Sequence, residues 1–262
     1  MSLVVFTDLD GTLLDAATYS WEAARSALEQ CHTRGALVIA VTSKTMAETR
    51  VASEAIGLDE RFIFENGGGI YVGGEQYLAL GMPYEDVRRG FAFLARQFPL
   101  QGMGDMSVVQ VADLTGLTIE EAAMARQRLF TEPFLYHGDD LGVLMAAAAG
   151  LGFQVVRGGR FYHLMAAEQS KGAAIQRLVQ NLEKESGVSL VTAALGDSPN
   201  DFPMLAVVDH PFLVRHKDGQ ATECPLDTVI ITGAAGPAGW SEAVSGLLAA
   251  WDRRSLRRGV HV

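Results

Sequence analysis

The chain has few cysteines, few basic residues and no long apolar run, and each shortage excludes a class of protein. Its 262 residues include two cysteines, Cys31 and Cys224, so a disulfide framework is not indicated. The longest nearly uncharged apolar stretch, residues 141–153, is too short to span a bilayer. The chain starts on an apolar run without the basic opening of a signal peptide, so we expect a cytoplasmic protein with no membrane partner.

Acidic residues outnumber basic ones. The 31 Asp and Glu against 21 Lys and Arg give a formal net charge of −10, which argues against a nucleic-acid partner because such proteins need an excess of cations. The Arg-rich segment 252–258 is a local exception, and we interpret it as a solvated chain end. An acidic protein that handles an anionic substrate must gather its cations at one place or use a metal ion.

Strands and helices alternate in the first and last thirds of the sequence. Short apolar runs typical of buried strands are followed by amphipathic segments with helical spacing. The expected strands are 3–6, 36–41, 61–64 and 190–195, and the expected helices are 21–34, 44–56, 171–185 and 239–251. We expect the helix 44–56 to be capped by Thr42-Ser43. This alternation predicts an α/β fold with a Rossmann-like parallel sheet covered on both faces.

The middle third has a different pattern. The expected elements are helices 84–98, 118–130 and 140–149, strands 134–136 and 153–156, a patternless stretch 101–106, and a turn 157–160 leading into strand 161–164. We therefore predict an inserted α+β cap domain, residues 83–165, within a core domain of residues 1–82 and 166–262. A cap of this kind is expected to close over the site and exclude water.

Polar side chains follow three of the predicted core strands. Asp8 and Asp10 follow the first strand, Thr42 follows the second, and Asp197 follows the strand 190–195. Ligands of an open parallel sheet bind at the carboxyl ends of its strands, so these side chains are expected to meet. Clustered carboxylates repel one another, and a hard divalent cation such as Mg²⁺ relieves that repulsion. The pattern predicts a magnesium site.

This set of residues suits phosphoryl transfer. A carboxylate such as Asp8 can act as a covalent nucleophile, and Asp10 can protonate the leaving oxygen and later activate water. Lys171, at the start of a predicted helix, and the hydroxyl of Thr42 can neutralise the phosphoryl charge. We therefore predict a phosphatase with an aspartyl-phosphate intermediate.

Four motifs resemble those of the haloacid-dehalogenase-like hydrolase superfamily. They are DLDGTLL at 8–14, TSKT at 42–45, SKG at 170–172 and GDSPND at 196–201. The resemblance implies that Asp8 is the nucleophile, Asp10 the acid/base, and Thr42 and Lys171 phosphate contacts. It also implies that Mg²⁺ is held by Asp8, the backbone carbonyl of Asp10, and Asp197, with Asp201 as a supporting acid.

A narrower resemblance is to the mannosyl-3-phosphoglycerate phosphatase branch of that superfamily. It is carried by TSKT at 42–45, ENGG at 65–68 and GGRFYH at 158–163. This resemblance implies a phosphorylated sugar as the small-molecule substrate, with mannosylglycerate and phosphate as products. The candidate substrate-binding residues are Ser43, Lys44, Asn66, Gly67, Arg157, Arg160, His163, Ser198 and Asn200. His163 lies on an apolar strand, where a buried core histidine is the more frequent interpretation.

Two rival functions stay open at this point. The substrate can be glucosyl-3-phosphoglycerate or another sugar phosphate, because the core motifs would be the same. A non-catalytic phosphate-binding module is the rival of another class, although both Asp8 and Asp10 are present. The sequence does not indicate an oligomeric state.

Overall fold

The computed structural model describes residues 2–74 and 76–258, with side chains described as far as Arg253. Its centre is a five-stranded parallel sheet in the order β12-β11-β10-β1-β2. The strands are Ser2–Thr7 (β1), Leu37–Ala40 (β2), Leu190–Gly196 (β10), His210–Arg215 (β11) and Ile230–Ala235 (β12). The central position of β1 and β10 places the residues that follow them in the middle of one sheet edge.

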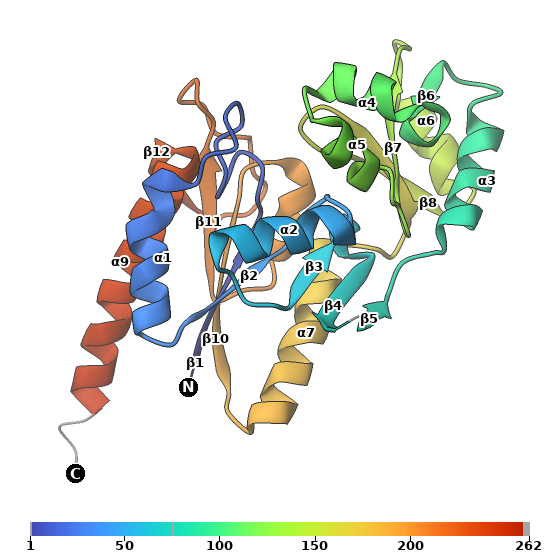
Figure 1. Cartoon of the computed structure of the whole chain (residues 1–262). Helices are drawn as coiled ribbons and strands as arrows, with labels where there is room; N and C mark the ends of the chain where they lie inside the picture. The colour runs from blue at the N-terminus through green and yellow to red at the C-terminus, as the bar shows by residue number, and fades with distance from the viewer. Residues whose placement is uncertain (1, 75, 259–262) are drawn as a thin grey trace.

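Helices cover both faces of this sheet, as Figure 1 shows. Alternate side chains of β1 point to opposite faces. Leu3 and Val5 belong to the same apolar cluster as side chains of α1 and α9, whereas Val4 and Phe6 cluster with those of α7 and α8. These helices are Arg25–Thr33 (α1), Gly236–Arg258 (α9), Lys171–Ser186 (α7) and Phe202–Leu205 (α8). The predicted α/β fold with a doubly covered parallel sheet is confirmed.

A small antiparallel sheet and one helix follow β2. The sheet has the order β3-β4-β5, made of Phe62–Phe64 (β3), Gly69–Gly73 (β4) and Gln76–Ala79 (β5), and the helix is Met46–Ile56 (α2). The N-cap of α2 is Thr45, whose hydroxyl accepts the Glu48 N–H while the Glu48 carboxylate accepts the Thr45 N–H. The predicted cap at Thr42-Ser43 is therefore wrong, because Thr45 and Glu48 form a complete capping box.

The middle of the chain forms a separate body at the upper right of Figure 1. Its four-stranded antiparallel sheet has the order β6-β7-β9-β8. Its elements are Tyr84–Leu94 (α3), Leu100–Gly102 (β6), Val108–Thr115 (α4), Ile119–Ala125 (α5), Glu132–Tyr136 (β7), Leu141–Ala149 (α6), Phe153–Arg157 (β8) and Tyr162–Ala166 (β9). Phe91, Phe134 and Leu164 belong to its own apolar core. We call this body the cap; its boundaries at 83 and 165 stay a prediction.

One helix of the cap was not predicted, and one predicted helix was too long. The helix α4 was not predicted, and the predicted helix 118–130 ends at Ala125. The chain from Arg126 to Thr131 is instead irregular and lies against the core. Short 3₁₀ helices complete the described part: Glu22–Ala24 (η1), Glu65–Gly67 (η2), Met103–Asp105 (η3) and Pro199–Asp201 (η4).

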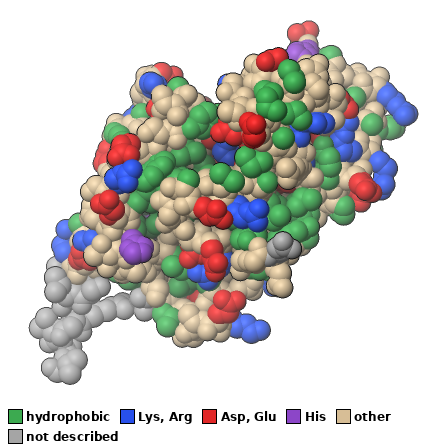
Figure 2. All heavy atoms as spheres, in the orientation of Figure 1, with side chains coloured by type: hydrophobic (Ala, Val, Ile, Leu, Met, Phe, Trp, Pro, Cys, Tyr) green, Lys and Arg blue, Asp and Glu red, His purple; other side chains and the backbone are tan. Residues whose placement is uncertain are grey.

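The described surface is mixed in charge and also exposes apolar side chains (Figure 2). Acidic and basic side chains are interspersed on the face shown in Figure 2. Among residues 2–74 and 76–258, no helix combines the length and apolarity needed to cross a membrane. At the predicted basic end, Asp252 of α9 is paired with Arg34 at 3.0 Å, and the side chains from Arg254 onward lie outside the described residues.

Candidate active site

Three buried carboxylates meet at the carboxyl edge of the central sheet. Asp8 directly follows β1 and Asp197 directly follows β10, and these strands pair in register with Thr7 opposite Leu195. Asp201 is the last residue of η4, one turn after Asp197. One ligand oxygen from each of the three carboxylates lies within 4.8 Å of the others. The parallel register therefore brings the predicted acidic residues of two distant motifs together.

Lys171 joins two of these carboxylates. It is the first residue of α7, and its ammonium group lies 2.6 Å from Asp8 Oδ1 and 2.6 Å from Asp201 Oδ1. Its side chain is fully buried. Burial alone would lower the pKa of Lys171, but the adjacent carboxylates of Asp201 and Asp8 outweigh it and raise that pKa. Lys171 therefore carries its positive charge inside the site.

Asp197 is held in place by neutral donors. Its Oδ1 accepts hydrogen bonds from Thr12 Oγ1 at 3.3 Å and Ser198 Oγ at 3.0 Å. Burial, followed by the neighbouring charge of Asp201, raises the pKa of Asp197 to about 6. Gly11 is close behind it: a Cβ at Gly11 would lie 2.6 Å from Asp197 Oδ2. A side chain at position 11 would therefore collide with Asp197. The raised pKa of Asp197 shows that the clustered carboxylates repel one another.

The carboxylates fit a hard divalent cation. Burial also raises the pKa of Asp8 well above its ordinary value, in spite of the Lys171 ammonium beside it. Both carboxylate oxygens of Asp201 already accept hydrogen bonds: Oδ1 from Lys171, and Oδ2 from the backbone N–H groups of Asp197 and Ser198. The oxygens of Asp8 and Asp197 that are not so engaged are the candidate ligands, and a cation between them would relieve their repulsion.

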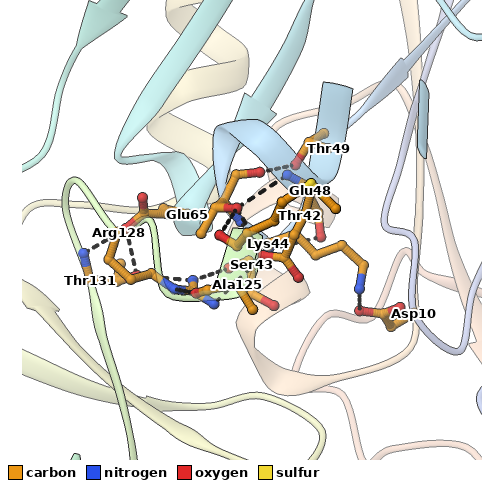
Figure 3. A network of polar contacts seen from close by, with 12 residues as sticks. Asp10, Thr42, Ser43, Lys44, Glu48, Thr49, Glu65, Ala125, Arg128 and Thr131 are labelled. Carbon is orange, nitrogen blue, oxygen red and sulfur yellow. Dashed lines mark hydrogen bonds and ion pairs between the residues drawn. The ribbon is translucent and has the colours of Figure 1, made fainter. Parts of the chain in front are cut away.

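Asp10 lies beside this cluster and makes a different contact. Its Oδ2 is 2.9 Å from the ammonium group of Lys44, a pair drawn in Figure 3. Its Oδ1 is buried and has no hydrogen-bond partner among the described residues. Its carboxylate is not one of the three that cluster, so the metal contact expected of its backbone carbonyl stays a prediction.

A cavity of about 740 Å³ opens above these residues, between the core and the cap. Core residues Asp8, Asp10, Ser43, Lys44, Asp197, Ser198 and Asn200 line one side. Cap residues Arg128, Arg157, Arg160, Phe161 and His163 line the other. The cavity therefore has an acidic end and a cationic end. Five predicted site residues are absent from the lining: Thr42, Asn66, Gly67, Lys171 and Asp201.

Three of those five residues belong to a loop framework under the cavity. Thr42 is buried, and its hydroxyl accepts the Lys44 N–H. Asn66 has a left-handed backbone (φ +55°) and accepts a hydrogen bond from the Asn200 side chain at 3.0 Å. Gly67 has φ +88°, and a Cβ there would lie 2.1 Å from the carbonyl oxygen of Ser170. The substrate contacts predicted for Asn66 and Gly67 stay predictions; the contacts described here are packing contacts between loops.

The predicted cap residues differ in character. Arg157, the last residue of β8, and Arg160, in the turn that follows, are both exposed, and Arg160 donates to the carbonyl of Leu114 at 2.9 Å. His163 is 5% exposed and still lines the cavity. Burial, followed by the charges of Arg128 and Lys171, lowers the pKa of His163 to about 3. Its Nδ1 is buried without a hydrogen-bond partner among the described residues, so this neutral imidazole is a core residue that also lines the cavity.

Sequence reasoning missed several residues of the site. Arg128 lines the cavity from the cap although it is largely buried, and Tyr19 places its ring 5.4 Å from the Lys44 ammonium. His216 Nδ1 lies 3.4 Å from Asp197 Oδ2. None of the three falls in a recognised motif. The expected helix through Phe130 would have made Arg128 an ordinary surface residue.

A family model and curated relatives match this chain. The model of the haloacid dehalogenase-like hydrolases matches residues 5–129. A glucosyl-3-phosphoglycerate/mannosyl-3-phosphoglycerate phosphatase of Persephonella marina is 35% identical over 257 residues, covering 92% of this chain and 96% of the relative. A protein of the same name from Methanococcoides burtonii is 34% identical over 270 residues, covering 95% and 98%.

Solved structures share the fold at lower identity. A phosphatase of the haloalkanoate enzyme superfamily from Bacteroides thetaiotaomicron aligns with a TM-score of 0.70 and 20% identity, covering 94% of each chain. At this identity the similarity shows the fold alone. It agrees with a parallel-sheet core that carries a separate antiparallel body.

Proposed function

The chain belongs to the haloacid dehalogenase-like hydrolase family and is a phosphoric monoester hydrolase, and on that basis we propose a magnesium-dependent mechanism through an aspartyl-phosphate on Asp8. Both Asp8 and Asp197 line the cavity, and of these two Asp8 is the one bound to Lys171. Among the described contacts, Lys171 binds only one of the two carboxylate oxygens of Asp8. That pairing orients the carboxylate and opposes the rise in its pKa that burial causes.

The first step transfers the phosphoryl group to Asp8. A carboxylate oxygen of Asp8 attacks phosphorus, the bond from phosphorus to the sugar-side oxygen breaks, and the carboxyl group of Asp10 protonates that leaving oxygen. Lys44, 2.9 Å from Asp10, stabilises the carboxylate that this proton transfer leaves behind. In the second step Asp10 accepts a proton from water, the water oxygen attacks phosphorus, and the bond to Asp8 breaks with release of phosphate.

Asp8 and Asp197 would hold the magnesium ion, with the Asp10 backbone carbonyl as the third expected protein ligand. When bound, Mg²⁺ supplies positive charge that the phosphoryl oxygens need during transfer. Asp201 and Lys171 fix the positions of both ligands from behind, and Thr12 and Ser198 orient Asp197. The rigid, buried arrangement means that little reorganisation is needed when charge develops.

We propose mannosyl-3-phosphoglycerate as the substrate. The observation that carries this proposal is the two-ended cavity, in which Arg157, Arg160 and the imidazole of His163 lie across from a site suited to a phosphoryl group. The substrate carries a phosphate, a carboxylate and a hydroxyl-rich ring, so it can use both ends. Glucosyl-3-phosphoglycerate is the second candidate, because the relatives that match most of this chain are named for both compounds.

The test is phosphate release from a panel of substrates. The panel contains mannosyl- and glucosyl-3-phosphoglycerate, several simple sugar phosphates and p-nitrophenyl phosphate, each with Mg²⁺ and with a chelator. We expect magnesium-dependent turnover with the highest kcat/KM on mannosyl-3-phosphoglycerate. Higher kcat/KM on a simple sugar phosphate would refute the substrate assignment, and undiminished turnover in chelator would refute the metal requirement.

A further inference from the structure

A polar network joins the cap to the core beside the site and reaches Asp10 through Lys44 (Figure 3). Its centre is Arg128, which follows α5 in the irregular segment of the cap. The guanidinium Nη1 donates to the carbonyl oxygen of Ser43 at 2.7 Å, and Nε donates to the carbonyl of Ala125 at 2.8 Å. Arg128 is 9% exposed, so these bonds form in a largely desolvated place, where charge-assisted hydrogen bonds are strong.

The segment that carries Arg128 is itself fixed to the core. The fully buried carboxylate of Glu65 accepts the backbone N–H groups of Leu129, Phe130 and Thr131 at 2.7, 2.9 and 2.8 Å. The Thr131 hydroxyl also donates to Glu65, at 2.8 Å. A buried carboxylate that accepts four hydrogen bonds is well compensated for its loss of water. Arg128 therefore approaches the core from a segment with little freedom.

The contact with Ser43 completes the bonding of the Thr42–Lys44 loop. The carbonyl of Thr42 accepts the Asn66 N–H at 2.9 Å, and the carbonyl of Lys44 accepts the Glu65 N–H at 2.9 Å. Between them, the carbonyl of Ser43 is bound by Arg128. Three successive carbonyls are thus held, the outer two by a core loop and the middle one by the cap.

The position of this loop matters to the reaction. Lys44 reaches from it to Asp10, and Ser43 and Lys44 line the cavity. The loop precedes the capping box of α2, so the Ser43 peptide is the part that the helix does not fix. Losing the Arg128 bond would leave the Ser43 carbonyl without this charged donor and let the peptide turn.

We propose that Arg128 is a positioning residue through which the seated cap sets the geometry of the Thr42–Lys44 loop. The proposal rests on the phosphatase function proposed above. Arg128 acts through the Ser43 carbonyl, not on the reacting atoms, by the hydrogen bond from its guanidinium group to that main-chain oxygen. Because Arg128 also lines the cavity, direct contact with the cap-side part of the substrate is the rival role.

The two roles predict different kinetics for a small substrate. p-Nitrophenyl phosphate carries no glycerate or sugar, so it needs the loop but not the cationic end of the cavity. If Arg128 positions the loop, Arg128→Met lowers kcat on both p-nitrophenyl phosphate and mannosyl-3-phosphoglycerate by about tenfold or more, the loss expected for one charge-assisted hydrogen bond. Arg128→Lys, which keeps the charge, restores part of that kcat.

The matched control is Arg88→Met. Arg88 is a partly buried cap arginine, and its ion pairs with Asp105 and Glu132 both lie within the cap. It is not among the residues that line the cavity. Arg88→Met should lower the melting temperature and leave kcat on p-nitrophenyl phosphate within about twofold.

Hydrogen exchange gives a second measurement that does not require turnover. In Arg128→Met the amide of Lys44, which donates to Thr42 Oγ1, should exchange faster than in Arg88→Met at equal global stability. Unchanged kcat on both substrates together with unchanged exchange at Lys44 would overturn the proposal. A rise in KM for mannosyl-3-phosphoglycerate alone would overturn it in favour of substrate contact. Absence of turnover by the wild-type enzyme would instead refute the proposed function.

Discussion

Removing the Lys171 ammonium should destabilise the protein strongly and in a pH-dependent way. In Lys171→Met the carboxylates of Asp8 and Asp201, each 2.6 Å from the lost nitrogen, would stay buried without their shared cation. Breaking a buried ion pair by removing one partner costs about 3–5 kcal/mol, and we expect about 4 kcal/mol at pH 7 in chelator. At pH 5 the loss should fall to about half of that, because burial already raises the pKa of Asp8 and the carboxyl groups can take up protons.

The assay is urea unfolding in chelator at pH 5 and pH 7, followed by tryptophan fluorescence, which reports on the buried Trp240. Lys184→Met is the matched control, since Lys184 is an exposed lysine near the end of the same helix, and its cost should stay within about 0.5 kcal/mol. A loss below about 1 kcal/mol for Lys171→Met, or the same loss at both pH values, would refute the electrostatic account of this buried group.

Three further predictions concern Asp197, Gly11 and His163. The pKa of Asp197 is raised from 3.8 to about 6 in the folded protein, so between these pH values the native state binds a proton that the unfolded state has released. In chelator, the free energy of unfolding of the wild type should therefore fall by about 3 kcal/mol relative to Asp197→Asn as pH rises from 3.8 to 6. Mg²⁺ should reverse this loss. Calorimetric unfolding with and without Mg²⁺ checks this, and stability that rises with pH relative to the variant would contradict it. Gly11→Ala should weaken magnesium binding about tenfold or more in a calorimetric titration, because its Cβ would meet Asp197 Oδ2. Gly35→Ala, also at positive φ but with open space around it, should leave the affinity unchanged, and equal affinities in the two variants would count against the steric argument. The pKa of His163 is lowered to about 3 in the folded protein, so the stability that its neutral imidazole contributes is fully present above about pH 6.5 and is lost as pH falls. In urea unfolding, the free energy of unfolding of the wild type should fall by up to about 2 kcal/mol relative to that of His163→Gln between pH 6.5 and pH 5. A difference in stability that stays constant over this range would show that His163 is not held neutral.

The core could be predicted from the sequence because its signals are local. Strands β1 and β10 are short apolar runs that end in polar motifs, and parallel pairing places those ends at one edge of a sheet. Asp8, Asp197 and Lys171 were therefore expected near one another from pattern alone. Their shared contacts follow from the register of two strands and from the start of one helix.

The cap and its contact with the core could not be predicted in the same way. Helix α4 was missed because it has only eight residues and its exposed Val109 and Leu114 obscure the buried apolar stripe, although Ser107 and Gln110 form a capping box and Gly116 ends the helix. Glu65 and Arg128 were missed as a pair of loop anchors because their partners are main-chain groups distant in sequence. No residue type marks a backbone carbonyl that needs a donor.

The most direct test of the central claim is detection of a phosphoryl group on Asp8. p-Nitrophenolate is a good leaving group that needs little acid assistance, so Asp10→Asn should still be phosphorylated by p-nitrophenyl phosphate while hydrolysis of the intermediate is slowed. After acid quench, peptide mass spectrometry should find one phosphoryl group on the peptide with Asp8, and none in Asp8→Asn. Release of nitrophenol by Asp10→Asn without any adduct on Asp8 would contradict the mechanism.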